Sequence, residues 1–200
     1  YYFKDIFSIL KNRNSLIQIF KLIVIGVMPA VAFGLFLPIS NLIDESSAIL
    51  VITAVAYIFI AIVLYFADKL EEGDKSILDL SSRESLTIGF AQALALLPGV
   101  SRSGITLSTA LYLKLKKTEA IFFSLLLGLP TIFGAWFLTF MQATEPIDSS
   151  LWIPCIAAFF SGLVAIRVLI SFTVSSKLNV FSIYCFLMGL VSLVTYSINL

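Results

Sequence analysis

The sequence predicts an all-α polytopic membrane protein with about five transmembrane helices and one re-entrant broken-helix hairpin. Of its 200 residues, 60% are hydrophobic and 12% are charged, whereas soluble domains are about half apolar and about a quarter charged. The apolar residues occur in runs of about 20, which is long enough to cross a hydrocarbon core of about 30 Å. Charged residues gather in short clusters between these runs, as in the loops of membrane proteins.

Five runs are long enough to span a membrane, at residues 17–37, 47–66, 119–141, 151–174 and 180–198. Together they predict a single transmembrane domain over residues 1–200. The chain begins with Tyr1 rather than Met, so we expect this domain to be N-terminally incomplete.

Residues 81–117 form a different kind of element, because the sequence PGVSRSG interrupts their helical pattern at residues 98–104. Ser81 and Glu84 have the spacing of a capping box, which predicts a helix start. From there to Pro98 is about 17 residues, or about 25 Å of helix, so the turn would lie deep in the bilayer. Irregular backbone at that depth needs protein or water around it, and we therefore expect a cavity at the turn.

The positive-inside rule places both ends of this element on the cytoplasmic side. Basic residues cluster around its start at Lys69, Lys75 and Arg83 and around its end at Lys114, Lys116 and Lys117. The loop containing Asp44 and Glu45 and the loop at residues 142–150 contain no Lys or Arg and are expected outside. An element that enters the membrane and returns agrees with every cluster, so we interpret residues 81–117 as a re-entrant hairpin.

The arginine at the turn is the strongest candidate for a functional residue. Arg102 would cost several kcal/mol at membrane depth without a partner. A helix is predicted to begin there, so its N-terminal amides would attract an anion, and a guanidinium adds bidentate hydrogen bonds to phosphate oxygens. The alternative is a serine-rich helix cap from which Arg102 reaches to water. Nearby polar or small residues are Gln92, Gly99, Ser101, Ser103, Gly104 and Thr106, with Thr106 and Thr109 on the same helical stripe as Arg102.

Other features narrow the chemistry. The chain contains no histidine, which excludes a Ser-His-Asp triad or a His-based metal site built from this chain alone. Its net charge of +1 argues against a nucleic-acid partner. Cys155 and Cys185 lie in apolar runs and are expected to be small buried hydrophobic residues. Arg167 is interpreted as a base that reaches from the fourth run to the membrane interface.

Residues 89–106, which read GFAQALALLPGVSRSGIT, resemble the second signature of the bacterial undecaprenyl-diphosphate phosphatase family, PGxSRSGxT after a Gln-bearing helix. Residues 119–130, EAIFFSLLLGLP, resemble the family's next helix, and residues 28–30, MPA, resemble a Pro-Ala in an earlier one. The resemblance covers most of the chain, and the long signature is specific.

The resemblance implies a multi-pass protein of the bacterial inner membrane, built from inverted repeats with two re-entrant hairpins. It implies an enzyme that hydrolyses undecaprenyl diphosphate to undecaprenyl phosphate and so recycles a lipid carrier for cell-wall synthesis. The expected partners are the membrane and a polyprenyl diphosphate lipid, with a homodimer as a candidate assembly. Arg102 and Ser101 would be catalytic, and the substrate would be bound by Ser103, Gly104, Thr106, Gly99 and Gln92.

The sequence departs from the family in one respect. The family's earlier signature, EGxTEFLPISSTGH in outline, carries glutamates and a histidine, and residues 36–40, FLPIS, echo only its middle. Mg²⁺ or Ca²⁺ is therefore expected as a cofactor with its ligands mostly outside this chain, no metal ligand is assigned within it, and we expect little hydrolysis by the chain as printed. Two other functions stay open at this point: a lipid-phosphate or anion transporter, which also uses broken helices near the midplane, and an inactive structural homologue.

Overall fold

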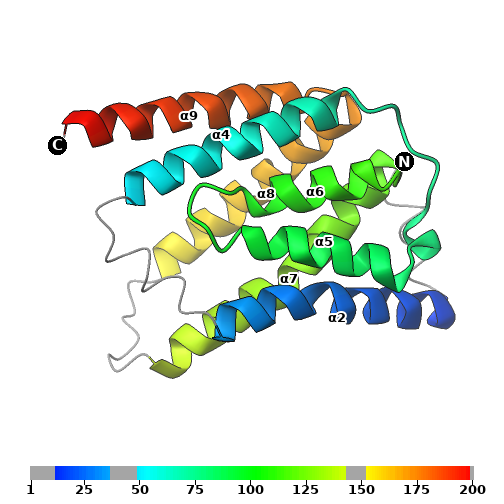
Figure 1. Cartoon of the computed structure of the whole chain (residues 1–200). Helices are drawn as coiled ribbons and strands as arrows, with labels where there is room; N and C mark the ends of the chain where they lie inside the picture. Colours follow the sequence, from blue (N-terminus) through cyan, green and yellow to red (C-terminus); the bar gives the residue numbers. More distant parts are fainter. Residues whose placement is uncertain (1–11, 37–48, 143–151, 199–200) are drawn as a thin grey trace.

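A computed structural model describes residues 12–36, 49–142 and 152–198. These residues form helices throughout, joined by short connections (Figure 1). The long helices are α2 (Arg13–Phe36), α4 (Ile49–Asp68), α7 (Lys117–Gln142), α8 (Trp152–Val174) and α9 (Leu178–Ile198), and all five are long and apolar enough to cross a membrane. The shorter elements are the 3₁₀ helix η1 (Ile77–Asp79) and the helices α5 (Ser82–Leu94) and α6 (Arg102–Tyr112). The predicted all-α polytopic architecture is therefore confirmed.

The two short helices lie at the centre of the bundle. Figure 1 shows α5 and α6 side by side and antiparallel, with the α4 and α9 pair on one side and α2 and α7 on the other. The turn between α5 and α6 does not extend as far as the ends of α4 and α9 beyond it. The hairpin is thus enclosed by long helices, as irregular backbone inside a membrane requires.

The two ends of the hairpin are tied together by backbone hydrogen bonds. The amide of Lys75 donates to the carbonyl oxygen of Lys114 at 3.1 Å, and the amide of Lys116 donates to that of Lys75 at 3.0 Å. Gly73 permits this contact, because a Cβ atom there would lie 2.0 Å from the Lys114 carbonyl oxygen. Both basic clusters therefore lie at one end of the molecule, which confirms the re-entrant interpretation. The base-free loops and the residues at 37–40 lie outside the described residues.

The topology can be tested by chemical labelling. Single cysteines that replace Lys75 and Lys116, in a background with Cys155 and Cys185 replaced by serine, should react with a membrane-impermeant maleimide from the same face of the membrane. That face should be the cytoplasmic one, because both positions lie in basic clusters. Reaction of the two cysteines from opposite faces would contradict the hairpin.

The helices α2 and α5 pack with their backbones almost in contact. A Cβ atom on Gly89 would lie 2.2 Å from the carbonyl oxygen of Gly26. Next to this contact, the buried hydroxyl of Ser85 donates to the carbonyl oxygen of Leu22 at 2.6 Å. Small residues at helix crossings allow such close approach in membrane proteins. This crossing holds the first arm of the hairpin against a membrane-spanning helix.

Apolar side chains are exposed along the outer faces of the long helices. On α8, the buried residue is Thr173, and Cys155 and most of the apolar side chains are exposed. The prediction of burial is therefore wrong for Cys155 and right for Cys185, which is 5% exposed. An apolar exposed surface of this kind suits lipid, since hydrocarbon chains solvate it without the penalty that water imposes.

Candidate anion-binding site at the hairpin break

The break between α5 and α6, residues 95–101, begins one turn before the proline. Helix α5 ends at Leu94 rather than at Pro98, because a residue before proline is driven out of the helical region and proline has no amide to donate. The amides of Ala95, Leu96 and Leu97 each donate to a carbonyl three residues earlier, at 3.0 to 3.1 Å. These short-range hydrogen bonds satisfy the last carbonyls of the helix. Because α5 ends at Leu94, the first arm of the hairpin is about 20 Å long.

A tight turn reverses the chain direction after Leu97. The amide of Val100 donates to the carbonyl oxygen of Leu97 at 3.2 Å, with Pro98 and Gly99 at the two central positions. Gly99 has φ of 94°, which is favourable for glycine alone. A Cβ atom there would also lie 2.6 Å from the carbonyl oxygen of Thr53 on α4. Gly99 therefore lets the turn pack directly against a membrane-spanning helix.

Helix α6 begins at Arg102, as predicted, and Ser101 is its N-cap. The hydroxyl of Ser101 accepts a hydrogen bond from the amide of Gly104 at 3.2 Å. Its carbonyl oxygen accepts from the amide of Ile105 at 2.8 Å. The amides of Arg102 and Ser103 have no intrahelical acceptor, as is general for the first residues of a helix. They are available to an anion at the positive end of the helix dipole.

The guanidinium of Arg102 is held by neutral groups. Its Nε donates to Gln92 Oε1 at 3.3 Å, and its Nη2 donates to the carbonyl oxygens of Leu127 at 3.3 Å and Gly128 at 2.7 Å. Gly128 leaves room for this contact, because a Cβ atom there would lie 3.4 Å from Nη1. Among the described residues, the ion pair is that of Lys75 with Glu84, far from Arg102 along the hairpin. The charge of Arg102 is thus oriented without being neutralised by a carboxylate.

Gln92 is fixed in orientation by the arginine. Since a guanidinium only donates, the atom that receives its hydrogen bond must be the amide oxygen. Gln92 is 3% exposed, and its Nε2 has no hydrogen-bond partner among the described residues. Buried donors normally find an acceptor, so Nε2 is a second group beside Arg102 that can serve an anion.

Thr106 lies in the joint between α6 and α7. It is 1% exposed, and its Oγ1 lies 2.9 Å from the carbonyl oxygen of Arg102 and 2.6 Å from Ser124 Oγ. Thr109 hydrogen-bonds the carbonyl oxygen of Ile105 in its own helix. The structure therefore places Thr106 beside Arg102 but engages its hydroxyl in helix packing.

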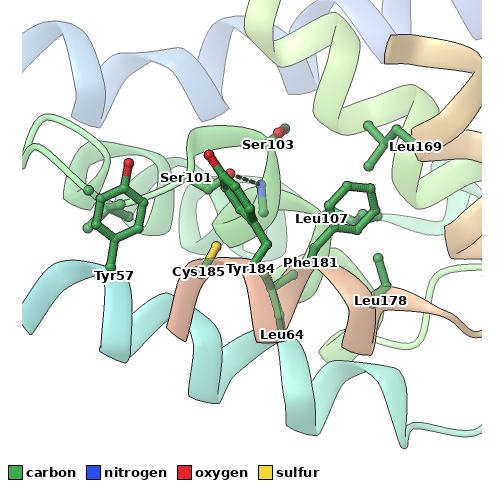
Figure 2. A pocket seen from close by; sticks show the side chains of 13 residues that line it. Tyr57, Leu64, Ser101, Ser103, Leu107, Leu169, Leu178, Phe181, Tyr184 and Cys185 are labelled. Atoms are coloured by element: carbon green, nitrogen blue, oxygen red, sulfur yellow. Dashed lines mark hydrogen bonds between the residues drawn. The ribbon is translucent and has the colours of Figure 1, made fainter. Parts of the chain in front are cut away.

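A groove of about 360 Å³ opens on the other side of the break, between the hairpin, α4, α8 and α9. From the predicted set it is lined by Gly99, Ser101, Ser103 and Gly104. Arg102 instead contacts Gln92 on α5 and Gly128 on α7, and Thr106 contacts Ser124 on α7. Figure 2 shows Tyr57 on α4 and Tyr184 on α9 extending toward the hairpin, with Ser101 capping the amide of Gly104. The predicted cavity at the turn is confirmed. The predicted residues lie around the start of α6, some facing the groove and the others facing α5 and α7.

The structure adds three residues that the sequence did not single out. Tyr57 and Tyr184 contribute the phenol groups of the groove, and Gly128 admits the arginine. A tyrosine in the middle of an apolar run was the available signal for the first two, since hydroxyls inside a membrane call for a polar neighbour. Gly128 lies in the EAIFFSLLLGLP segment but has no side chain to mark a role.

At the inner end of the hairpin, the predicted capping box of Ser81 and Glu84 is present. Lys75 Nζ donates to Glu84 Oε1 at 2.6 Å, and this bond, together with one from the Ser81 amide, lowers the pKa of Glu84 from 4.5 to about 2. Glu119 accepts from Ser76 Oγ at 2.7 Å and from the amide of Ile77. Carboxylates thus accept hydrogen bonds at the inner end of the hairpin, whereas the break at its other end carries hydrogen-bond donors.

This ion pair predicts a pH dependence of stability. Because the folded protein lowers the pKa of Glu84, the bond stabilises the fold above pH 4.5 and is lost as the pH falls from about 4.5 toward about 2. The variant Glu84→Gln should therefore be less stable than the parent at neutral pH and should lose less on acidification over this range, as measured by thermal denaturation in detergent. The exposed Glu72→Gln provides the control. Parallel curves for the parent and Glu84→Gln would contradict the assignment.

The described residues contain no group of three or more His, Cys, Asp or Glu that could hold a metal ion. Around the break the polar groups are hydroxyls, amides and a guanidinium. Divalent Mg²⁺ and Ca²⁺ favour carboxylate oxygens, so these residues do not fit a metal site by themselves.

The fold and the break together define a multi-pass membrane protein with a re-entrant hairpin, whose break carries Arg102 and the first amides of α6. A family model described as "Bacitracin resistance protein BacA" matches residues 1–191. The chain belongs to this family.

Relatives in this family support the assignment over most of the chain. The protein named undecaprenyl-diphosphatase from Thermosipho africanus is 35% identical over 189 residues, which cover 94% of this chain and 73% of the relative. Its namesake from Christiangramia forsetii is 36% identical over 204 residues, covering 96% and 74%. Undecaprenyl-diphosphatase 3 of Bacillus cereus is 33% identical over 198 residues, covering 96% and 75%.

Proposed function

We propose that this chain acts in the hydrolysis of undecaprenyl diphosphate to undecaprenyl phosphate in the bacterial inner membrane, and that its hairpin break binds the diphosphate. The observation that supports this most is Arg102, a guanidinium in the middle of a membrane-embedded bundle that is bound by neutral acceptors alone among the described residues. Such a charge needs a counterion, and the adjoining amides at the start of α6 attract the same kind of group.

The reaction exchanges one P–O bond for another. Water adds its oxygen to the terminal phosphorus, the bond from that phosphorus to the bridging oxygen breaks, and the products are inorganic phosphate and the lipid monophosphate. Negative charge on the bridging and terminal oxygens is stabilised by Arg102 and by the amides of Arg102 and Ser103. The hydroxyls of Ser101 and Ser103 lie at the same helix start and can donate to the phosphate oxygens.

Four parts of the expectation remain predictions. A Mg²⁺ or Ca²⁺ cofactor would need carboxylate ligands that the described residues around the break do not offer. The catalytic role of Ser101 also stays a prediction, and the structure gives its hydroxyl a role as helix cap. A homodimer and the absence of a nucleic-acid partner also remain predictions.

The proposal is tested by measuring the products formed by the gene product that contains this sequence. Purified into lipid nanodiscs and given undecaprenyl diphosphate, it should release one inorganic phosphate for each lipid monophosphate formed. A transporter would instead move the lipid between leaflets of a vesicle without releasing phosphate, and an inactive homologue would do neither. Lipid movement without phosphate release, or no reaction at all, would contradict the proposal.

A further inference from the structure

One turn of helix α7 contacts the first turn of α6 and also the side chain of Arg102. Residues three or four apart share a face of a helix, so Arg102 and Thr106 lie together on α6, and Ser124 and Gly128 lie together on α7. Thr106 Oγ1 contacts Ser124 Oγ, and the guanidinium of Arg102 donates to the carbonyl oxygen of Gly128. The position of α7 therefore bears on both the backbone and the side chain at the start of α6.

The hydroxyls of Ser124 and Thr106 form a chain that ends on the carbonyl oxygen of Arg102. Thr106 Oγ1 lies 2.9 Å from this carbonyl oxygen and 2.6 Å from Ser124 Oγ. Ser124 Oγ lies farther, at 3.5 Å, from the carbonyl oxygen of Ser103. Each hydroxyl has one proton to donate, and both short distances are used when Ser124 donates to Thr106 and Thr106 donates to Arg102. Both side chains are buried, so bulk water does not compete for these bonds.

The carbonyl at the end of this chain belongs to the same peptide unit as the amide of Ser103. A peptide unit is planar and trans, with its carbonyl and its N–H pointing in opposite directions. Fixing the Arg102 carbonyl therefore also fixes the direction of the Ser103 N–H, which has no intrahelical acceptor. Hydrogen bonds in a chain polarise one another, so a carbonyl that accepts a bond makes the N–H of its own unit a stronger donor.

We propose that Ser124 is a positioning residue for the reaction, acting through Thr106 rather than by touching the phosphate. Through Thr106 it orients the Ser103 amide, while the same turn of α7 orients the guanidinium of Arg102. The inference rests on the proposed function, because the two donors act as a pair only if they stabilise charge on one phosphate. Without the Ser124 hydroxyl both donors are still present but are less well aligned, so the reaction should slow more than binding weakens.

Ser182→Ala is the matched control for Ser124→Ala. Ser182 is a buried serine on α9 that donates to the carbonyl oxygen of Ala61 on α4 at 2.7 Å. Each variant removes one buried hydroxyl from a contact between two long or hairpin helices, and of the two serines Ser124 is the one linked to Arg102. Ser124→Thr keeps a hydroxyl at the same position and tests whether that hydroxyl is what the reaction needs.

Phosphate release by the gene product in lipid nanodiscs gives the first measurement. Ser124→Ala should lower kcat for undecaprenyl diphosphate by about 10-fold or more, because a misplacement of about 1 Å costs up to about 10²-fold, and should leave KM close to that of the parent. Ser124→Thr should recover most of the kcat, and Ser182→Ala should keep it. A parent-like kcat in Ser124→Ala, or equal losses in Ser124→Ala and Ser182→Ala, would overturn the positioning role.

A double variant covers the case in which Ser124→Ala alone fails to fold. Combining Ser124→Ala with Thr106→Val removes both hydroxyls and leaves no buried hydroxyl without its partner, a change that can be nearly neutral for stability. Its kcat should fall as in Ser124→Ala, again with KM close to that of the parent. A folded double variant with the kcat of the parent would overturn the proposal.

Side-chain nitrogen NMR of the protein with labelled arginine gives a readout that does not depend on turnover. The Nη signals of Arg102 are identified by their loss in Arg102→Lys. Ser124→Ala should shift these signals, because the guanidinium loses its fixed orientation, and Ser182→Ala should leave them in place. Unchanged signals in Ser124→Ala would overturn the proposal. If the parent releases no phosphate and the shift is observed, the proposed function is wrong while the orientation of Arg102 by Ser124 stands.

Discussion

Replacing Arg102 by alanine is expected to lower kcat/KM for undecaprenyl diphosphate by about 10²- to 10³-fold, the usual loss for one donor that stabilises developing charge. Arg102→Lys should recover only a small part of this activity. A lysine keeps the positive charge but has a single ammonium group, whereas the planar guanidinium of Arg102 donates to Gln92, Leu127 and Gly128 at the same time. Initial rates of phosphate release measure both effects.

The control for this prediction is Arg167→Ala. Arg167 is exposed on α8, so its removal should leave kcat/KM close to that of the parent. Thermal denaturation of each variant separates a catalytic loss from unfolding, because Arg102 also links α6 to α7. If Arg102→Lys folds normally and turns over the lipid as fast as the parent, the phosphate-binding role of the fork is wrong.

The largest expected loss of stability follows from Gly89→Val. A Cβ atom at this position would lie 2.2 Å from the carbonyl oxygen of Gly26, and this backbone oxygen cannot move aside as a flexible side chain could. Helices α2 and α5 would have to separate, so we expect a cost of about 3 kcal/mol or more, at or above the upper end of ordinary overpacking. Reversible unfolding in mixed micelles measures the change in the free energy of unfolding.

Gly134→Val is the matched control for this substitution. Gly134 lies within helix α7, and no heavy atom lies within 4 Å of a Cβ built there. Both variants therefore carry the same change in helix propensity, and only Gly89→Val adds a clash. Equal stabilities of the two variants would show that the crossing of α2 and α5 is not as close as described.

Run length and charge placement were sufficient to predict the membrane-spanning helices and the hairpin. Each predicted run overlaps one long helix, and the capping box and the PGVSRSG sequence correctly placed the two helix starts at Ser82 and Arg102. These features are local, because a cap, a proline and a stretch of apolar residues act on their own segment of chain. The first arm ended earlier than expected because the proline affects the turn that precedes it.

The direction of each side chain could not be predicted in the same way. The helical stripe grouped Arg102 with Thr106, yet which neighbouring helix that stripe contacts depends on how α6 packs against α7. In the structure it meets Ser124 and the carbonyl oxygens beside Gly128. The lining of the groove could not be predicted either, because a helix that is apolar on all sides gives no periodic signal for the face that carries Tyr57 or Tyr184.

At the break, the guanidinium of Arg102 is expected to contact the phosphate of a bound lipid. Solid-state NMR of the protein in lipid bilayers tests it directly, through the dipolar coupling between the phosphorus of bound farnesyl phosphate and nitrogen-labelled arginine side chains. We expect a coupling to one arginine, lost in Arg102→Lys and retained in Arg167→Lys. A bound phosphate that shows no coupling to any arginine, or one that persists in Arg102→Lys, would contradict it.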